Sequence, residues 1–312
     1  MPDCLEFNKV GNRRIGPICR FKGILSLEKQ VVCMKLTIGE HAGFCFGVRR
    51  AVDKAFACAG EQLPCVTLGP LIHNPQEVAR LESAGVRSVD SLDQVLSGQT
   101  VIIRSHGVTP QVYAQCEARG IPVIDCTCPH VAHIHQLVHQ YSQGGDAVVI
   151  VGEPDHPEIV GIAGWAHGEV FILPTREAAE NAQLPGRALV VAQTTLRRDR
   201  FEDVLSVIRG KVADLTVRMT ICAATSKRQQ EAEALSHEAD VMIIVGGRNS
   251  SNTKKLLETC RLRCARSYQV ETPQDVPQGM IKDSDRVAIT AGASTPQWLL
   301  EQVRLAIEAD AD

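Results

Sequence analysis

Short apolar runs alternate with amphipathic segments along almost the whole chain. The alternation predicts parallel sheets with helices on both faces. Several helices have clear start signals, because Pro110, Pro129 and Pro296 each stand where a first turn would begin. The predicted strands are residues 36–38, 66–68, 86–89, 101–104, 123–125, 147–151, 170–173, 188–192, 215–218, 241–245, 267–270 and 287–290.

The spacing of these strands repeats. Units that begin at Val66, Ala147 and Val241 each run strand, helix, strand, helix, strand, helix, strand, but the third unit lacks its last strand. One strand, residues 36–38, is left over at the start of the chain, so we expect it to complete the third unit. The predicted α/β domains are residues 46–127, residues 128–220, and residues 35–45 together with 221–312.

The start of the chain does not fit this pattern. Residues 1–33 contain no periodic segment, and Met34 opens the first convincing strand. We expect residues 1–34 to form a loosely ordered extension; the alternative is that translation begins at Met34.

Composition excludes several classes of function. The net charge is −3, no basic face is evident, and aromatic residues make up 4%, which argues against a nucleic-acid partner. No apolar stretch is long enough for a membrane helix, and the N-terminus lacks the layout of a secretory signal. We expect a cytoplasmic protein with no membrane partner.

Twelve cysteines are many for such a chain. In a cytosolic α/β protein they favour metal or redox chemistry over disulfides. Because paired CxxC motifs are absent, metal-binding cysteines must come from distant parts of the sequence.

Three cysteines occupy equivalent positions, one in each repeat. Cys45, Cys128 and Cys222 each follow a predicted strand and precede or open a helix. Parallel sheets bind ligands at the carboxyl ends of their strands, and a helix N-terminus favours a thiolate. One such cysteine alone would more simply be a small buried residue, but the repetition favours metal ligands. Cys126 remains an alternative ligand.

The number of ligands bears on the chemistry. Three cysteines on a four-iron cluster would leave one iron without a protein ligand, and such an iron can act as a Lewis acid.

Polar loops follow six other strand ends, around His73, His106, His156, Thr194, Ser250 and Ser294. Their groups are mostly neutral or titratable hydrogen-bonding groups, several at helix starts, which suits a diphosphate. Glu158 could donate a proton to a leaving hydroxyl. The simpler interpretations are structural histidines, helix caps and a first-turn acid.

A second set of histidines lies within one predicted helix. The spacing of His133, His135 and His139 would allow a zinc site, but we favour a solvated helix face.

Nine motifs occur in a characteristic order: HAGFCFGV, GPLIHNP, RSHGV, DCTCP, DHPEIVG, QTTL, ICAATSKRQ, VGGRNSSNT and TAGAST. Together they resemble the 4-hydroxy-3-methylbut-2-enyl diphosphate reductases, iron–sulfur enzymes that catalyse the last step of the methylerythritol phosphate route to isoprenoids. The resemblance covers about residues 35–300.

The resemblance implies a fold and a set of site residues. It implies three similar α/β domains with mostly parallel sheets, in a pseudo-threefold trefoil around a central 4Fe-4S cluster on Cys45, Cys128 and Cys222. It implies catalytic roles for Glu158 and Thr194. The substrate-binding residues that it implies are His73, His106, His156, Thr194, Ser250, Ser251, Asn252 and Ser294. Cys126 departs from the family pattern, where Ala is expected.

The implied reaction is the reductive dehydroxylation of 4-hydroxy-3-methylbut-2-enyl diphosphate to isopentenyl and dimethylallyl diphosphate. A ferredoxin or flavodoxin-type protein would donate the electrons, since no flavin or nicotinamide motif is evident. One alternative is a quinolinate-synthase-like dehydratase. It would clamp a dicarboxylate with Arg or Lys, and only Arg104 and Arg248 lie near the loops. Another alternative, an electron-transfer module, would need a fourth cysteine ligand and no acid like Glu158.

Overall fold

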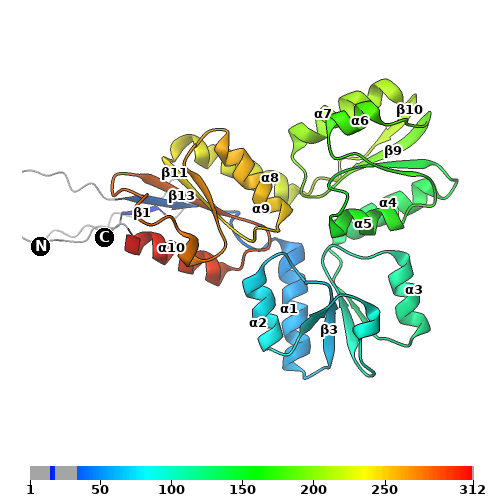
Figure 1. Ribbon diagram of the computed structural model, residues 1–312, viewed down its shortest axis with the longest axis horizontal. Coiled ribbons are helices and arrows are strands. Elements are labelled where there is room, and N and C mark those ends of the chain that lie inside the picture. Colours follow the sequence, from blue (N-terminus) through cyan, green and yellow to red (C-terminus); the bar gives the residue numbers. More distant parts are fainter. Residues whose placement is uncertain (1–14, 18–33, 311–312) are drawn as a thin grey trace, which may run out of the picture. The chain divides into compact units, whose positions relative to one another are not determined.

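Three sheets form the framework of the protein (Figure 1). The computed structural model describes residues 15–17 and 34–310. The chain divides into two compact units, Cys45–Ser226 and Met1–Phe44 with Lys227–Asp312. The first unit holds two sheets and the second holds the third.

The described residues include no helix that is both long enough and apolar enough to cross a membrane.

The first sheet of the unit Cys45–Ser226 has four parallel strands. Their order is β4 (Arg87–Val89), β3 (Cys65–Leu68), β5 (Thr100–Ile103) and β6 (Val123–Asp125). The other elements of this region are α1 (Phe46–Gly60), α2 (Pro75–Ser83), η1 (Leu92–Gln94) and α3 (Pro110–Ala118). Val66, Val101 and Ile103 form part of a core with Cys116 of α3, as expected for strands buried by helices.

The second sheet of this unit is also parallel. Its order is β10 (Asp214–Val217), β9 (Arg187–Ala192), β7 (Ala147–Val151) and β8 (Val170–Ile172). Figure 1 shows helices on both of its faces. One face packs against α4 (Pro129–Ser142) and α5 (Pro157–Gly164), and the other against α6 (Arg176–Asn181) and α7 (Arg198–Lys211). Alternate residues of β7 serve the two cores: Val148 and Ile150 face α4 and α5, whereas Val149 and Val151 face α6 and α7.

The other unit contains the third sheet. Its order is β1 (Ile15–Pro17), β2 (Lys35–Ile38), β13 (Arg286–Ala291), β11 (Val241–Val245) and β12 (Ser267–Val270). All neighbouring pairs are parallel except β1 with β2. The remaining elements are α8 (Ala223–Glu238), which begins in the first unit, and α9 (Ser251–Arg261), η2 (Pro273–Asp275) and α10 (Gln297–Asp310).

The predicted repeat is confirmed. If β2 is counted as the fourth strand of the third repeat, the four strands of every repeat are arranged in the order second, first, third, fourth. In the third sheet β1 is added beside β2. The strand left over at the start of the sequence is β2, and it pairs with β13 to complete the third sheet as expected. How the three sheets are arranged around a centre stays a prediction, as does the boundary between residues 46–127 and 128–220.

Two expectations need correction. Helices were expected between the second and third strands of each repeat, but two of these connections contain only the 3-10 turns η1 and η2. The capping geometry explains the second turn, because Thr272 and Asp275 cap each other and close it after three residues. In the predicted loose extension, Ile15–Pro17 forms β1, since its backbone finds partners on the free edge of β2; residues 1–14 and 18–33 lie outside the described residues.

Proline fixes the start of several helices at the carboxyl ends of strands. Pro75, Pro110, Pro129 and Pro157 each occupy the first turn of a helix, where the missing N–H costs no hydrogen bond. The helices therefore begin at defined residues, and the loops that precede them are held in place.

Candidate active site

The three predicted cysteines stand at equivalent helix starts. Cys45 is the N-cap of α1, Cys128 is the N-cap of α4, and Cys222 directly precedes α8. Their carbonyls accept the first helical hydrogen bonds, from the N–H groups of Arg49 (2.9 Å), Ala132 (2.9 Å) and Ser226 (3.0 Å). All three are free thiols and partly exposed, in contrast to the other six described cysteines, which are buried.

Cys45 and Cys222 both lie within electrostatic reach of the Cys128 thiol. Burial raises the pKa of the Cys128 thiol, and the neighbouring Cys45 and Cys222 raise it further, while the backbone N–H groups of His130 and Val131 lower it. Helix α1 is held close to Cys128: Arg50 Nη1 donates to the Thr127 carbonyl (2.9 Å). A Cβ on Gly47 would stand 2.6 Å from the Cys128 sulfur, so only glycine fits there.

The three sulfur atoms do not lie as close together as the ligands of a single metal ion. In the described part of the chain, only His73, His106 and His156 bring three potential ligand atoms within 4.8 Å of one another. At least one pair of the three sulfurs is therefore farther apart than that. Thiolates on one zinc ion would stand closer, at about 3.8 Å from tetrahedral bonds of about 2.3 Å.

Cys126 does not share this environment. Its side chain is fully buried, and burial raises the pKa of its thiol to about 11. The charged groups that act on it are Lys54, Arg50, Asp125 and Cys58, and none of the three helix-start cysteines is among them. These observations favour Cys128 over Cys126 as a ligand.

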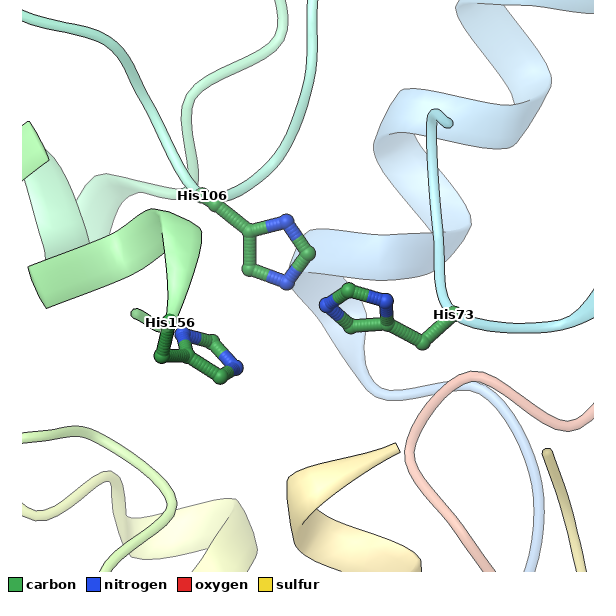
Figure 2. A group of neighbouring side chains, drawn as sticks. All are labelled: His73, His106 and His156. Atoms are coloured by element: carbon green, nitrogen blue, oxygen red, sulfur yellow. The ribbon is translucent and has the colours of Figure 1, made fainter. Parts of the chain in front are cut away.

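Three histidine rings converge in the same unit (Figure 2). The ring centroids of His73 and His106 are 4.7 Å apart, those of His73 and His156 5.6 Å, and those of His106 and His156 5.4 Å. His73 precedes α2 and His106 follows β5 of the first sheet. His156 is the N-cap of α5, which packs on the second sheet. Such a cluster can bind a polyanion when protonated or a metal ion when neutral.

Among the three histidines, His106 has a pKa that its surroundings shift strongly. Its pKa lies well below the ordinary value because protein surrounds the ring, and because His73, His156 and Arg104 add positive potential. Its buried Nδ1 has no hydrogen-bond partner among the described residues. An anion placed beside this ring would offset the positive potential and raise the pKa of the ring.

Glu158 and Thr194 form a buried pair. The N–H and the hydroxyl of Thr194 donate to Oε1 and Oε2 of Glu158, both at 2.6 Å. The backbone N–H of Glu158 donates to Nδ1 of His156 (3.2 Å), so the backbone of this residue contacts a member of the histidine cluster. The Thr194 carbonyl accepts the N–H of Cys222 (3.0 Å), so the acid and one cysteine are linked through a single residue.

The remaining predicted residues lie in the other unit. Ser250 caps α9, since its hydroxyl accepts the N–H of Thr253 (3.3 Å). Ser251 accepts a hydrogen bond from Nζ of Lys255 (2.6 Å). Asn252 is buried, and its amide nitrogen and oxygen have no hydrogen-bond partners in the described chain. Ser294 is buried in the loop after β13.

Sequence reasoning missed Lys255 as a site candidate. Its side chain is buried near the start of α9, and its Nζ donates the hydrogen bond to Ser251. The i, i+4 spacing from Ser251 was a signal in the sequence, but it did not indicate burial.

The interpretation of the second histidine set was only partly right. His133 is exposed, as expected for a solvated face. His135 is buried, and its ring stacks on Trp165 at 5.3 Å and 18°. It is buried because α4 packs against α5, whose C-cap is Trp165. His139 Nδ1 lies 2.8 Å from Nε2 of His167, and no zinc-type triad involves these residues.

These features define the class: an α/β enzyme whose thiols, imidazoles and buried acid gather where parallel strands end. The chain belongs to the LytB protein family, whose model matches residues 36–308. It is 43% identical over 274 residues to the 4-hydroxy-3-methylbut-2-enyl diphosphate reductase of Caldanaerobacter subterraneus subsp. tengcongensis, covering 86% of this chain and 95% of the relative. It is also 43% identical to the enzyme of that name from Geobacter sulfurreducens, with the same coverage.

Solved structures agree. A structure of (E)-4-hydroxy-3-methyl-but-2-enyl diphosphate reductase, described as the terminal enzyme of the non-mevalonate pathway, is 42% identical, with a TM-score of 0.66 over 87% of this chain and 98% of that one. The structure of the E-1-hydroxy-2-methyl-but-2-enyl-4-diphosphate reductase from Plasmodium falciparum is 26% identical, with a TM-score of 0.82 over 88% of this chain and 87% of that one.

The buried His135 predicts how stability depends on pH. Burial lowers the pKa of His135 to about 4. Between pH 6.5 and pH 4 the unfolded chain therefore binds a proton that the folded chain does not, so stability falls as the pH falls. From pH 7 to pH 5 we expect the free energy of unfolding to lose roughly 1–2 kcal/mol through this residue.

Urea unfolding of the wild type, His135→Gln and His133→Gln at pH 7 and pH 5 measures this loss. His135→Gln should reduce the difference between the two pH values, whereas His133→Gln, an exposed position on the same helix, should leave it unchanged. An equal loss in wild type and His135→Gln would contradict the assignment.

Proposed function

We propose that this protein reductively dehydroxylates 4-hydroxy-3-methylbut-2-enyl diphosphate to isopentenyl and dimethylallyl diphosphate, with a 4Fe-4S cluster held by Cys45, Cys128 and Cys222. The observation that carries the proposal is the gathering of three partly exposed thiols, each after the last strand of a repeat, beside three converging histidines and a buried acid. The names of the relatives point to the same reaction.

The diphosphate is assigned to the polar loops. His73, His106 and His156 would surround its oxygens and donate hydrogen bonds to them. Helix starts with exposed N–H groups favour phosphate, and Ser250 stands at such a start. The buried amide of Asn252, unsatisfied by the described residues, suits a ligand contact. The proposal includes Ser251 and Ser294 for the same anion.

We assign to Glu158 the role of donating the proton that the leaving hydroxyl needs. Its Oε2 lies 2.6 Å from the hydroxyl of Thr194, which can both donate and accept. A proton on Oε2 can pass to Thr194 Oγ1, and Thr194 can pass its own proton to the substrate oxygen. Burial of the carboxyl group excludes bulk water from this exchange. The overall reaction consumes two electrons and two protons and releases water.

When bound, the cluster would supply electrons one at a time and an iron without a protein ligand, able to polarise the hydroxyl oxygen. A ferredoxin or flavodoxin-type protein is the proposed donor. We place the reaction in the cytoplasm, because the described cysteines are free thiols, which suits a reducing compartment.

The dehydratase alternative finds less support. A dicarboxylate would need a pair of cationic clamps near the loops. Arg248 is exposed, and its guanidinium already pairs with Glu271 (3.6 Å) and Asp275 (3.3 Å). That pairing leaves Arg104 as the one remaining candidate from the sequence analysis.

Anaerobic turnover tests the proposal. The reconstituted protein, with dithionite and a viologen mediator, should convert the hydroxylated allylic diphosphate to both products and contain about four irons per chain. A dicarboxylate substrate serves as the comparison. Absence of product from a protein with intact cluster content, or a spectrum with four thiolate-ligated irons, would refute the proposal.

Replacing Glu158 by Gln should lower turnover by about 10²–10⁴-fold, the usual contribution of a general acid. The amide keeps a carbonyl oxygen that can accept from the Thr194 N–H, so substrate affinity should be retained. Single-turnover kinetics separate the two effects, and Thr194→Ser, which keeps the hydroxyl, is the matched control. Full activity in Glu158→Gln would remove the acid role.

Replacing Gly47 by Ala should lower the iron and sulfide content of the purified protein. The new Cβ would stand 2.6 Å from the Cys128 sulfur, which must move away from its position. Gly60→Ala is the control, because it lies at the end of the same helix with no atom within 4 Å of the added Cβ. If both variants hold equal iron and sulfide, the Cys128 sulfur is not a ligand in this position.

A further inference from the structure

Arg104 lies at the start of the loop that carries His106, and its side chain packs against the loop that carries His73. It follows β5 directly and stands two residues before His106. Its guanidinium lies over Gly69, at the start of the loop that leads to His73: a Cβ on Gly69 would be 2.6 Å from Nη1 and 3.3 Å from Cζ. Gly69 also has φ +69°, so both space and backbone conformation require glycine here.

The guanidinium has no partner in the described chain. No side chain or carbonyl accepts a hydrogen bond from it, and its Nε is buried without a partner. Burial lowers the pKa of Arg104. None of the ion pairs of the described residues includes its guanidinium, in contrast to other arginines of the region. In the same sheet region, Arg80 pairs with Glu77 (2.8 Å) and Arg119 with Asp93 (3.0 Å).

Arg104 is partly buried, and a partly buried cation without an ion-pair partner is costly, so an anion that enters the site offsets the cost. Arg104 is among the charges that act on His106, together with His73 and His156. The region therefore gathers four basic groups. A guanidinium remains charged at any accessible pH and can donate two parallel hydrogen bonds to a phosphate.

We propose that Arg104 is a fourth diphosphate-binding group, which contacts a phosphate of the substrate and gives the histidine cluster a permanent positive charge. This inference rests on the proposed function, because it assumes a diphosphate ligand. It predicts that Arg104 favours diphosphate over monophosphate, since the more highly charged anion gains more from a fixed cation.

Calorimetric titration of the anaerobic holoenzyme with inorganic pyrophosphate and with phosphate tests the inference. Arg104→Met should weaken pyrophosphate binding by about 10- to 100-fold, the range for a hydrogen bond to a charged group. Arg104→Lys should lose less, because it keeps the charge but not the paired donors. Arg119→Met, which removes a surface arginine of the same region, should bind as the wild type does.

The melting temperature without ligand separates binding from support of the fold. Arg104→Met removes an unpaired charge, so it should melt at or above the wild-type temperature. Unchanged pyrophosphate affinity in Arg104→Met would overturn the inference. So would a lower melting temperature accompanied by equal losses for pyrophosphate and phosphate, since that pattern marks a scaffold residue.

The wild type distinguishes this inference from the proposed function. If the wild type turns over the allylic diphosphate and binds pyrophosphate while Arg104→Met does so equally well, only the role of Arg104 is wrong. If the wild type neither binds pyrophosphate nor turns over the substrate, the proposed function and this inference fail together.

Discussion

Two backbone hydrogen bonds hold the candidate site together. The N–H of Cys128 donates to the carbonyl of Ser105, and the N–H of Cys222 donates to the carbonyl of Thr194, both at 3.0 Å. Each bond joins the start of a cysteine-bearing helix to the loop after the neighbouring strand, and those loops carry His106 and the partner of Glu158. Because parallel strands end at one edge of a sheet, the two bonds place thiols, imidazole and acid within one region.

Charge is distributed unevenly in this region. His73, His106, His156 and Arg104 bring basic groups together, while Glu158 is the acid that accompanies them, held by both donors of Thr194. A site of this composition attracts a polyanion and keeps one carboxyl group in a defined orientation. The proposed reaction needs both properties, because it must hold a diphosphate and deliver a proton to the opposite end of a small substrate.

Close backbone approach is the second requirement of the site. Gly47 stands against the Cys128 sulfur, and Gly69 stands beneath the Arg104 guanidinium. Gly107, with φ +71°, leaves room for the ring of His135, whose Cε1 would be 2.5 Å from a Cβ there. At each of these positions a larger residue would displace a side chain of the site or of its support.

The sequence by itself determined strands β2 to β13, their threefold repetition and the equivalent places of Cys45, Cys128 and Cys222. These features depend on local hydrophobic period and on local helix starts, which a single chain displays directly. The closure of the third sheet by β2 also followed from the count of strands in each repeat.

Tertiary structure decided the features that depend on which elements become neighbours. The sequence suggests that His135 is an exposed helix residue, but α5 packs over it. The sequence also suggests Cys126 as a possible ligand, but its side chain is fully buried. Arg104 and Lys255 became candidates for the site only when the structure showed how far their side chains are buried. Burial and pairing arise from contacts between distant segments, and no local pattern of residues encodes them.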